Sequence, residues 1–186
     1  MEAKTLQTII REVSVYGKMV HEDEIHKVVE LCAAANRIFV AGAGRSGCCA
    51  KGFANRLMHL GKTVHVVGEI TTPSIQKGDL LVLGSGSGTT ESLVADAKKA
   101  SKCGALIATI TLCPEAPIGQ LADAVVTVPG VTWKSNHTEN AIETIQPGGS
   151  LFEQLSWLIY DSIIVELMDS LGQTEETMTP RHANLE

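Results

Sequence analysis

The chain has 186 residues, of which 44% are hydrophobic, 19% charged and 4% aromatic, and its formal net charge is −6. These values are typical of a soluble globular protein whose core is built from aliphatic side chains. The negative charge and the lack of any run of Lys or Arg exclude a typical nucleic-acid partner, because binding to a phosphate backbone needs a concentrated cationic face.

Neither a membrane span nor a signal peptide is expected. The longest nearly apolar stretch, residues 155–168, is interrupted by Asp161 and Glu166, so it falls short of the ~20 apolar residues that cross a bilayer. The first residues lack the basic and apolar regions of a secretion signal. The five cysteines form no CxxC pair, which favours reduced thiols in a cytoplasmic protein.

Two amphipathic helices are predicted first, because apolar residues recur at helical spacing within residues 6–16 and again within 25–31. Short apolar runs then alternate with helical stretches. The predicted strands are residues 37–41, 64–68, 80–84, 106–110 and 124–128, and the predicted helices are 47–60, 91–101, 118–122 and 150–171.

Strands that alternate with helices indicate parallel βαβ units. We therefore predict an α/β fold, a three-layer doubly wound sheet of five parallel strands in the order 2-1-3-4-5, with two N-terminal helices and a long C-terminal helix. Residues 1–186 are expected to form one domain, with a helical lead 1–35, an α/β core 36–171 and a tail 172–186. The last helix is apolar on most sides, which indicates either contact with another subunit or central burial.

Two segments rich in glycine and hydroxyl side chains follow the first and third predicted strands. Segment 42–47 contains Gly44, Arg45 and Ser46, and segment 85–90 reads Ser85-Gly86-Ser87-Gly88-Thr89-Thr90. In the predicted order these two strands are neighbours, and ligands bind beyond the carboxyl ends of strands where the strand order reverses. We expect both segments to face one site.

Segment 85–90 predicts a phosphate site. Glycines let the backbone approach an anion, hydroxyl groups are neutral donors, and the following helix presents its positive N-terminal dipole. The alternative is that one hydroxyl only caps this helix. That role needs a single side chain, whereas the segment has four.

Segment 42–47 also matches the dinucleotide fingerprint G-x-G-x-x-G, and Glu69 ends the next strand. A dehydrogenase usually needs a second domain, for which this chain leaves no residues, and a nicotinamide cofactor does not explain segment 85–90. We expect no cofactor. No H-E-x-x-H motif or cysteine pair indicates a metal site.

Residues 40–47 and 84–91 resemble the sugar isomerase (SIS) family, whose fold is flavodoxin-like. Residues 55–61, 146–154 and 182–186 make the chain similar to the 6-phospho-3-hexuloisomerases within that family. The resemblance covers essentially the whole chain. One departure is Gly148, where a bulkier residue, often Met, is expected.

The resemblance implies interconversion of 3-hexulose 6-phosphate and fructose 6-phosphate through an enediol, in the ribulose monophosphate route of formaldehyde fixation or its reverse. It also implies a homotetramer, or at least a homodimer, and functional pairing with a 3-hexulose-6-phosphate synthase. An isomerase of another phosphorylated sugar and a non-catalytic sugar-phosphate-binding regulator are the alternatives with the same fold.

The resemblance places the catalytic base at Glu153, in the first turn of the last predicted helix. A base that removes a carbon-bound proton needs a pKa nearer neutrality than that of a free carboxylate, and partial burial supplies such a shift. The residues alone leave a second interpretation open, because Ser150 and Glu153 also match a capping box, S-x-x-E.

An acid or hydrogen-bond donor is expected beside the base, and His59, His137 and His182 are the candidates. Core packing explains His59 equally well. His182 lies in a tail with little reason to be ordered alone, which is either solvated or reaches the site of a neighbouring subunit, as in related folds. Lys134, Asn136 and His137 are candidate contacts to the sugar hydroxyls.

Overall fold

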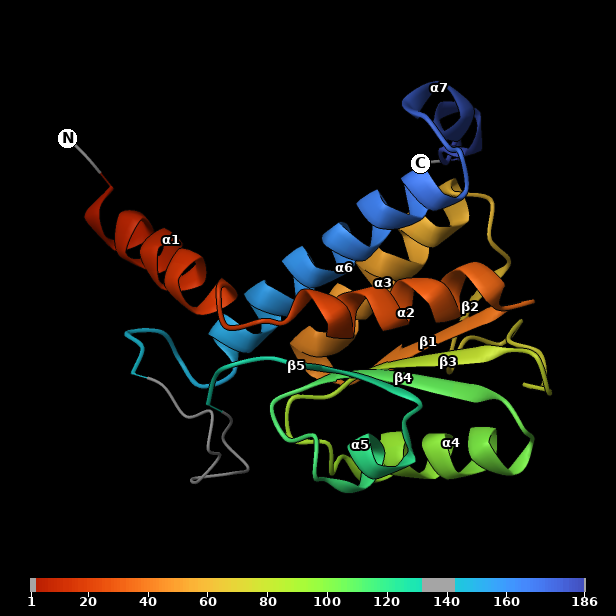
Figure 1. Ribbon diagram of the computed structural model, residues 1–186, viewed down its shortest axis with the longest axis horizontal. Coiled ribbons are helices and arrows are strands. Elements are labelled where there is room, and N and C mark those ends of the chain that lie inside the picture. Colours follow the sequence, from red (N-terminus) through yellow and green to blue (C-terminus); the bar gives the residue numbers. More distant parts are fainter. Residues whose placement is uncertain (1–2, 132–142, 186) are drawn as a thin grey trace.

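A computed structural model describes residues 3–131 and 143–185 (Figure 1). Its strands are β1 (Ile38–Gly42), β2 (Val64–Val66), β3 (Leu80–Gly84), β4 (Leu106–Thr111) and β5 (Ala124–Thr127). They form one sheet in the order β2-β1-β3-β4-β5, and every pair is parallel. The predicted fold class and strand order are confirmed.

Helices cover both faces of the sheet (Figure 1). One face carries α2 (Glu22–Ala34), α3 (Gly44–His59) and α6 (Ser150–Ser170), and the other carries α4 (Glu91–Lys102) and α5 (Pro117–Leu121). Successive strand residues point to opposite faces, so the sheet divides the core in two. Val40 and Val82 pack in the core beneath α3 and α6, whereas Phe39 and Leu81 pack in the core beneath α4.

The first helix, α1 (Lys4–Gly17), extends away from the sheet (Figure 1). It buries none of its residues. Leu6, Ile10 and Val15 remain 53%, 50% and 52% exposed. Its amphipathic pattern was predicted, but only part of its apolar stripe, including Val13 and Tyr16, packs against the core.

The long helix α6 lies between α2 and α3 (Figure 1). Most of its apolar side chains are buried there, while Trp157, Leu158 and Val165 stay 45%, 51% and 60% exposed. Central burial therefore explains most of its apolar surface, and these three side chains remain available for another contact. Neither α6 nor any other helix within residues 3–131 and 143–185 is long and apolar enough to cross a membrane.

The beginning of α3 differs from the prediction. The helix starts at Gly44, three residues before the predicted start, so Gly44, Arg45 and Ser46 form its first turn rather than a loop. Gly44 has a φ of +57°, and a Cβ added there would meet no atom within 4 Å. Glycine makes this turn accessible because it adopts a positive φ without steric cost.

The tail is held by contacts with the rest of the subunit rather than ordered alone. Residues after α6 form α7 (Glu175–Met178) and a 3₁₀ helix, η1 (Thr179–Arg181). Met178 is buried in the core. Arg181 donates a hydrogen bond of 3.1 Å to the carbonyl of His59, at the last turn of α3. The tail thus completes the carboxyl end of a core helix, whose last carbonyls lack partners within the helix.

An ion pair joins the beginnings of β1 and β3. Asp79, which is 2% exposed, accepts hydrogen bonds from Nε and Nη2 of Arg37 at 3.0 and 2.6 Å and from the N–H of Gln76 at 2.8 Å. Burial raises the pKa of Asp79, but the hydrogen bonds from Arg37 and Gln76 outweigh burial and hold it below its ordinary value.

Asp79→Asn should lower the free energy of unfolding by about 2 kcal/mol at pH 7, because it leaves the partly buried Arg37 without its counter-ion. The folded-state pKa lies below the unfolded one, so the carboxylate's stabilisation is complete above about pH 4 and is lost as the pH falls through the folded-state pKa. Urea unfolding at pH 7 and again below about pH 4 measures the difference in the free energy of unfolding between Asp79→Asn and the native chain. The exposed Asp161→Asn is the control. Equal stability of Asp79→Asn and the native chain at pH 7 would contradict this role.

Candidate functional site

A cleft of about 380 Å³ lies at the carboxyl edge of the sheet, beyond the ends of β1 and β3. This is the point where the strand order reverses. Three parts of the chain line it: the start of α3, the end of β3 with the loop after it, and the start of α6. The lining residues are Ala43, Gly44, Arg45 and Ser46 from the first part, Gly84, Ser85, Gly86, Ser87 and Thr90 from the second, and Gly148, Gly149, Phe152 and Glu153 from the third. Leu93 and Leu112 complete the lining. The structure therefore brings both glycine-rich segments and Glu153 to one cleft.

The first turn of α3 approaches β1 closely because two glycines face each other. A Cβ on Gly47 would lie 2.7 Å from the carbonyl oxygen of Gly42, and a Cβ on Gly42 would lie 2.9 Å from the Cα of Gly47. Gly84 is paired with Gly42 in the sheet, and a Cβ there would lie 2.9 Å from the hydroxyl of Tyr160. These small residues let the start of α3 lie directly against the strand ends.

Most carbonyl groups of segment 85–90, those of Ser85, Gly86, Gly88 and Thr90, accept hydrogen bonds from the protein itself. The carbonyl of Ser85 accepts from the N–H of Gly88 at 3.2 Å, that of Gly86 from Leu112 at 3.0 Å, and that of Gly88 from Ile118 at 3.1 Å. The segment is thereby fixed against β4 and α5. What it offers to a ligand is mainly hydrogen-bond donors, as an anion requires.

The hydroxyl groups of this segment do not cap α4. Thr90 is the N-cap residue, but no side-chain hydrogen bond caps the helix. The Oγ of Ser87 accepts from the N–H and the hydroxyl of Thr89, at 3.3 and 3.1 Å. Ser85 is 3% exposed, and its Oγ has no hydrogen-bond partner among the described residues. A buried hydroxyl is costly without a partner, so Ser85 is suited to a ligand oxygen.

Gly88 and Thr89 do not line the cleft. Gly88 has a φ of +62°, and a Cβ there would lie 2.6 Å from the Cβ of Ala116. It therefore turns the loop against the segment before α5, while Thr89 orients Ser87. Within this cleft the two residues support the loop and Ser87, and their direct contact with a substrate stays a prediction.

Glu153 does not form the predicted capping box. The N-cap of α6 is Gly149, with a φ of +91°, and no side chain caps the helix. Glu153 lies one position beyond the one that reaches back to an N-cap. Its Oε2 instead accepts a hydrogen bond from Nε of Arg45 in an ion pair across the cleft. Its Oε1 lies near Gly149, where an added Cβ would be 3.6 Å away.

The ion pair joins a mostly buried carboxylate to an exposed guanidinium. The side chain of Glu153 is 15% exposed and that of Arg45 is 70% exposed. The hydrogen bond to Glu153 and its negative charge raise the pKa of Arg45, so the cleft contains a permanent positive charge beside the carboxylate. Arg45 can leave Glu153 for an anionic ligand without crossing the protein interior.

The structure does not bring His59 and His182 to this cleft. His59 ends α3, a helix of 16 residues, and such a helix is roughly 24 Å long, so the histidine lies at the opposite end from Gly44. The rings of His59 and His182 stack with their centroids 5.0 Å apart. Burial, followed by the neighbouring His182 and Arg56, lowers the pKa of His59. Within one subunit this pair cannot reach Glu153.

The remaining candidates, Lys134, Asn136 and His137, lie outside the described residues. Within residues 3–131 and 143–185, no group of three or more His, Cys, Asp and Glu side chains is placed to hold a metal ion.

Sequence reasoning missed the apolar floor of the cleft. Phe152 and Leu112 both line it, and a Cβ on Gly86 would lie 3.3 and 3.2 Å from these side chains. It also missed Gly149, which forms the wall next to Glu153. Gly148 and Gly149, directly before a helical pattern, could have indicated this wall from the sequence. No local pattern indicates that Leu112 reaches the site.

The fold and the cleft define an α/β protein that binds a small anionic molecule between two strand-end segments beside a carboxylate. The chain belongs to the SIS domain family, which matches residues 31–143.

Relatives along the full length refine this assignment. The chain is 43% identical to a 3-hexulose-6-phosphate isomerase of Bacillus subtilis over 96% of this chain and 95% of that one. It is 41% identical to the protein of that name from Mycobacterium gastri, over 97% and 89%. The structure also resembles the crystal structure of a Methanococcus jannaschii protein, from which a molecular function of 3-hexulose-6-phosphate isomerase has been inferred. The TM-score is 0.82 and the identity 33%, over 98% of this chain and 99% of that one.

Ser85→Ala should weaken the binding of fructose 6-phosphate by about tenfold, the effect of losing one hydrogen bond to a charged group. The melting temperature should be unchanged, because no described residue loses a partner. Titration calorimetry and thermal unfolding measure the two effects. Ser170→Ala, at the exposed end of α6, is the control. Unchanged affinity would remove Ser85 from the phosphate site.

Proposed function

We propose that this chain is a sugar-phosphate isomerase that interconverts 3-hexulose 6-phosphate and fructose 6-phosphate. The observation that carries the proposal is that the carboxylate of Glu153 lies in the same cleft as segment 85–90. A substrate whose phosphate binds this segment directs its sugar carbons toward the start of α6. Similarity along nearly the whole chain to two 3-hexulose-6-phosphate isomerases supports this substrate among phosphorylated sugars.

The reaction moves a carbonyl group between C3 and C2 of the sugar. Glu153 removes the proton on C2 of 3-hexulose 6-phosphate, the C–H electrons form a C2–C3 double bond, and the carbonyl oxygen on C3 takes up a proton. The product of this step is an enediol. Return of the proton to C3, with loss of the hydroxyl proton on O2, leaves the carbonyl at C2. One base on one face of the enediol serves both transfers.

Arg45 is suited to support this chemistry. It holds Oε2 of Glu153, so Oε1 is the oxygen that takes the proton. A guanidinium beside the base is also suited to stabilise the negative charge that develops on the substrate oxygens as the enediol forms.

Glu153→Gln should lower kcat by about 10³-fold, because an amide cannot act as the base. Affinity for fructose 6-phosphate and the melting temperature should stay close to those of the native chain, since the phosphate contacts are elsewhere. NMR detection of both ketoses measures turnover, and Asp169→Asn on the exposed side of α6 is the control. A variant that keeps its activity excludes Glu153 as the base, and a native chain that binds without converting is a sensor rather than an isomerase.

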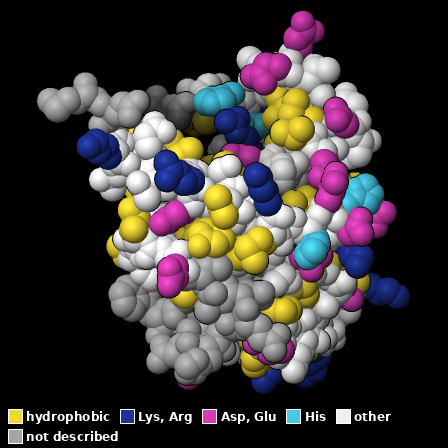
Figure 2. All heavy atoms as spheres, turned by 60° about the vertical axis from the view of Figure 1, so that its left-hand side comes forward, with side chains coloured by type: hydrophobic (Ala, Val, Ile, Leu, Met, Phe, Trp, Pro, Cys, Tyr) yellow, Lys and Arg dark blue, Asp and Glu magenta, His cyan; other side chains and the backbone are white. Residues whose placement is uncertain are grey.

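The exposed apolar faces of α1 and α6 support self-association, for which the family resemblance suggests a homotetramer. No residue of α1 is fully buried in its own subunit, and Leu158 and Val165 of α6 are 51% and 60% exposed. Figure 2 shows hydrophobic side chains gathered in the middle of the face that is turned forward from the side of α1. Contact between copies would cover them, and it can place the end of α3 of one subunit, with His59 and His182, at the cleft of another.

The similarity to 3-hexulose-6-phosphate isomerases supports a cytoplasmic enzyme of the ribulose monophosphate route. A 3-hexulose-6-phosphate synthase is then the functional partner, because it makes the ketose that this cleft is proposed to bind.

His182→Ala should lower kcat by about 10²-fold if the histidine pair serves a neighbouring cleft as acid. Phosphate affinity should not change. The substitution keeps the bond from Arg181 to α3, so it separates loss of the histidine from loss of packing, whereas truncation after Pro180 removes both. Asn184→Ala is the control in the same tail. An unchanged kcat in both His182→Ala and the truncated chain rules the tail out.

A further inference from the structure

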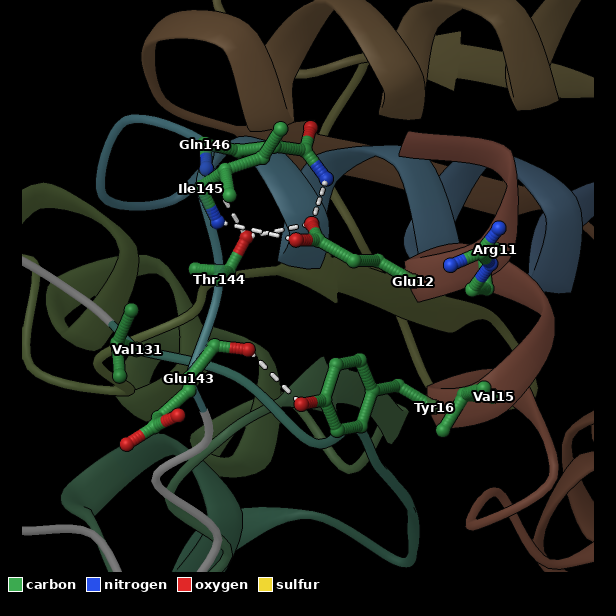
Figure 3. A pocket seen from close by; sticks show the side chains of 9 residues that line it. All are labelled: Arg11, Glu12, Val15, Tyr16, Val131, Glu143, Thr144, Ile145 and Gln146. Carbon is green, nitrogen blue, oxygen red and sulfur yellow. Dashed lines mark hydrogen bonds between the residues drawn. The ribbon is translucent and has the colours of Figure 1, made fainter. Parts of the chain in front are cut away.

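A second hollow, of about 760 Å³, lies between α1 and residues 143–146 (Figure 3). Glu12 points from α1 toward this segment. Its Oε2 accepts from Oγ1 of Thr144 at 2.7 Å and from Nε2 of Gln146 at 2.9 Å, and its Oε1 accepts from the N–H of Ile145 at 3.0 Å. Three donors from three consecutive residues therefore converge on one carboxylate.

A second side chain of α1 extends this contact. The hydroxyl of Tyr16, one turn after Glu12, donates to the carbonyl of Glu143 at 2.8 Å (Figure 3). Within the segment, Oγ1 of Thr144 accepts from the N–H of Gln146 at 3.1 Å. All four residues of 143–146 are thus tied to α1 or to each other.

The segment leads directly into the cleft. Gln146 is 9% exposed, and the glycines at 148 and 149 line the cleft wall. The N–H of Gly149 donates to the carbonyl of Val131 at 3.2 Å, and the N–H of Glu153 donates to the carbonyl of Gly149 at 3.0 Å. Only Pro147 and Gly148 separate Gln146 from this N-cap, so we expect a shift of Gln146 to be passed on to Gly149 and to the backbone of Glu153.

The hydrogen bonds of Glu12 and Tyr16 join α1 to this segment. No residue of α1 is fully buried, although Val13 and Tyr16 also pack against the core. The bonds from Ile145, Gln146 and Thr144, in decreasing order, lower the pKa of Glu12. The side chain is therefore an ionised acceptor at neutral pH, which matches the three donors that face it.

We propose that Glu12 is a positioning residue, which ties residues 143–146 to α1 and thereby sets the placement of Gly149 and Glu153 in the cleft. Its kinetic consequence rests on the proposed function, while its structural consequence does not. An N-terminal helix with no fully buried residue would in this way control the geometry of the base.

The test is Glu12→Gln, which keeps the side chain's size but replaces one acceptor oxygen by a donor. We expect kcat to fall about tenfold, because displacement of a reacting group by the order of 1 Å costs up to about 10²-fold. Affinity for fructose 6-phosphate should change less than about twofold, since segment 85–90 is untouched. Amide hydrogen exchange in residues 143–153 should become faster, with protection elsewhere unchanged.

Two further variants are compared with Glu12→Gln. Tyr16→Phe removes only the bond to Glu143 and should change kcat and exchange in the same direction by a smaller factor. Glu30→Gln is the matched control, because Glu30 lies on α2 with its side chain 68% exposed. It should leave both measurements unchanged.

Hydrogen exchange separates failure of this inference from failure of the proposed function. If the native chain binds but converts nothing, faster exchange confined to 143–153 in Glu12→Gln still supports the positioning role. Unchanged exchange overturns it, and so does faster exchange with an unchanged kcat in an active enzyme. Faster exchange throughout the chain also overturns it, because Glu12 would then act on the whole fold.

Discussion

Gly42 and Gly47 face each other where β1 passes into α3, and no side chain fits between them. Because of this close approach, the first turn of α3 lies beside the end of β3 instead of above the sheet. Arg45 then reaches across the cleft to Glu153. A larger residue at either glycine would push the start of α3 away from the strand ends and move Arg45 away from Glu153.

Different elements of the cleft are suited to phosphate binding and to catalysis. Most carbonyls of segment 85–90 are bonded within the protein, and Ser85, which lines the cleft, has a buried hydroxyl with no hydrogen-bond partner among the described residues. Glu153 lies on a different element, at the opposite wall. Binding energy from a phosphate that does not react can therefore hold the sugar carbons against the base, which is how remote contacts raise kcat. The apolar floor of Phe152 and Leu112 limits access of water.

Features that depend on local pattern could be predicted from the sequence. The short apolar runs and the glycines after them gave the strands, and chain connectivity then placed the two segments at one switch point. The start of α3 could not be read in this way, because Gly44 and Gly47 are poor helix formers and only packing against β1 makes that turn helical.

Contacts between distant residues left no local signal. Glu12 meets Thr144 across 132 positions, and Arg181 meets His59 across 122. Neither periodicity nor a motif indicates such pairs, so the order of the tail and the role of α1 emerged only from the structure. The capping box failed for a similar reason, since the left-handed Gly149 starts α6 one residue away from the position that the motif assumes.

The proposed enzyme shifts a carbonyl between C2 and C3 of a phosphorylated ketose. Incubation of fructose 6-phosphate with the native chain in deuterated water, followed by NMR of the recovered sugar, detects this shift. We expect deuterium at C3, where the enediol between C2 and C3 exchanges its proton, and none at C1. Deuterium at C1, as an aldose–ketose isomerase would introduce it, or no deuterium in a sugar that binds, would exclude this reaction.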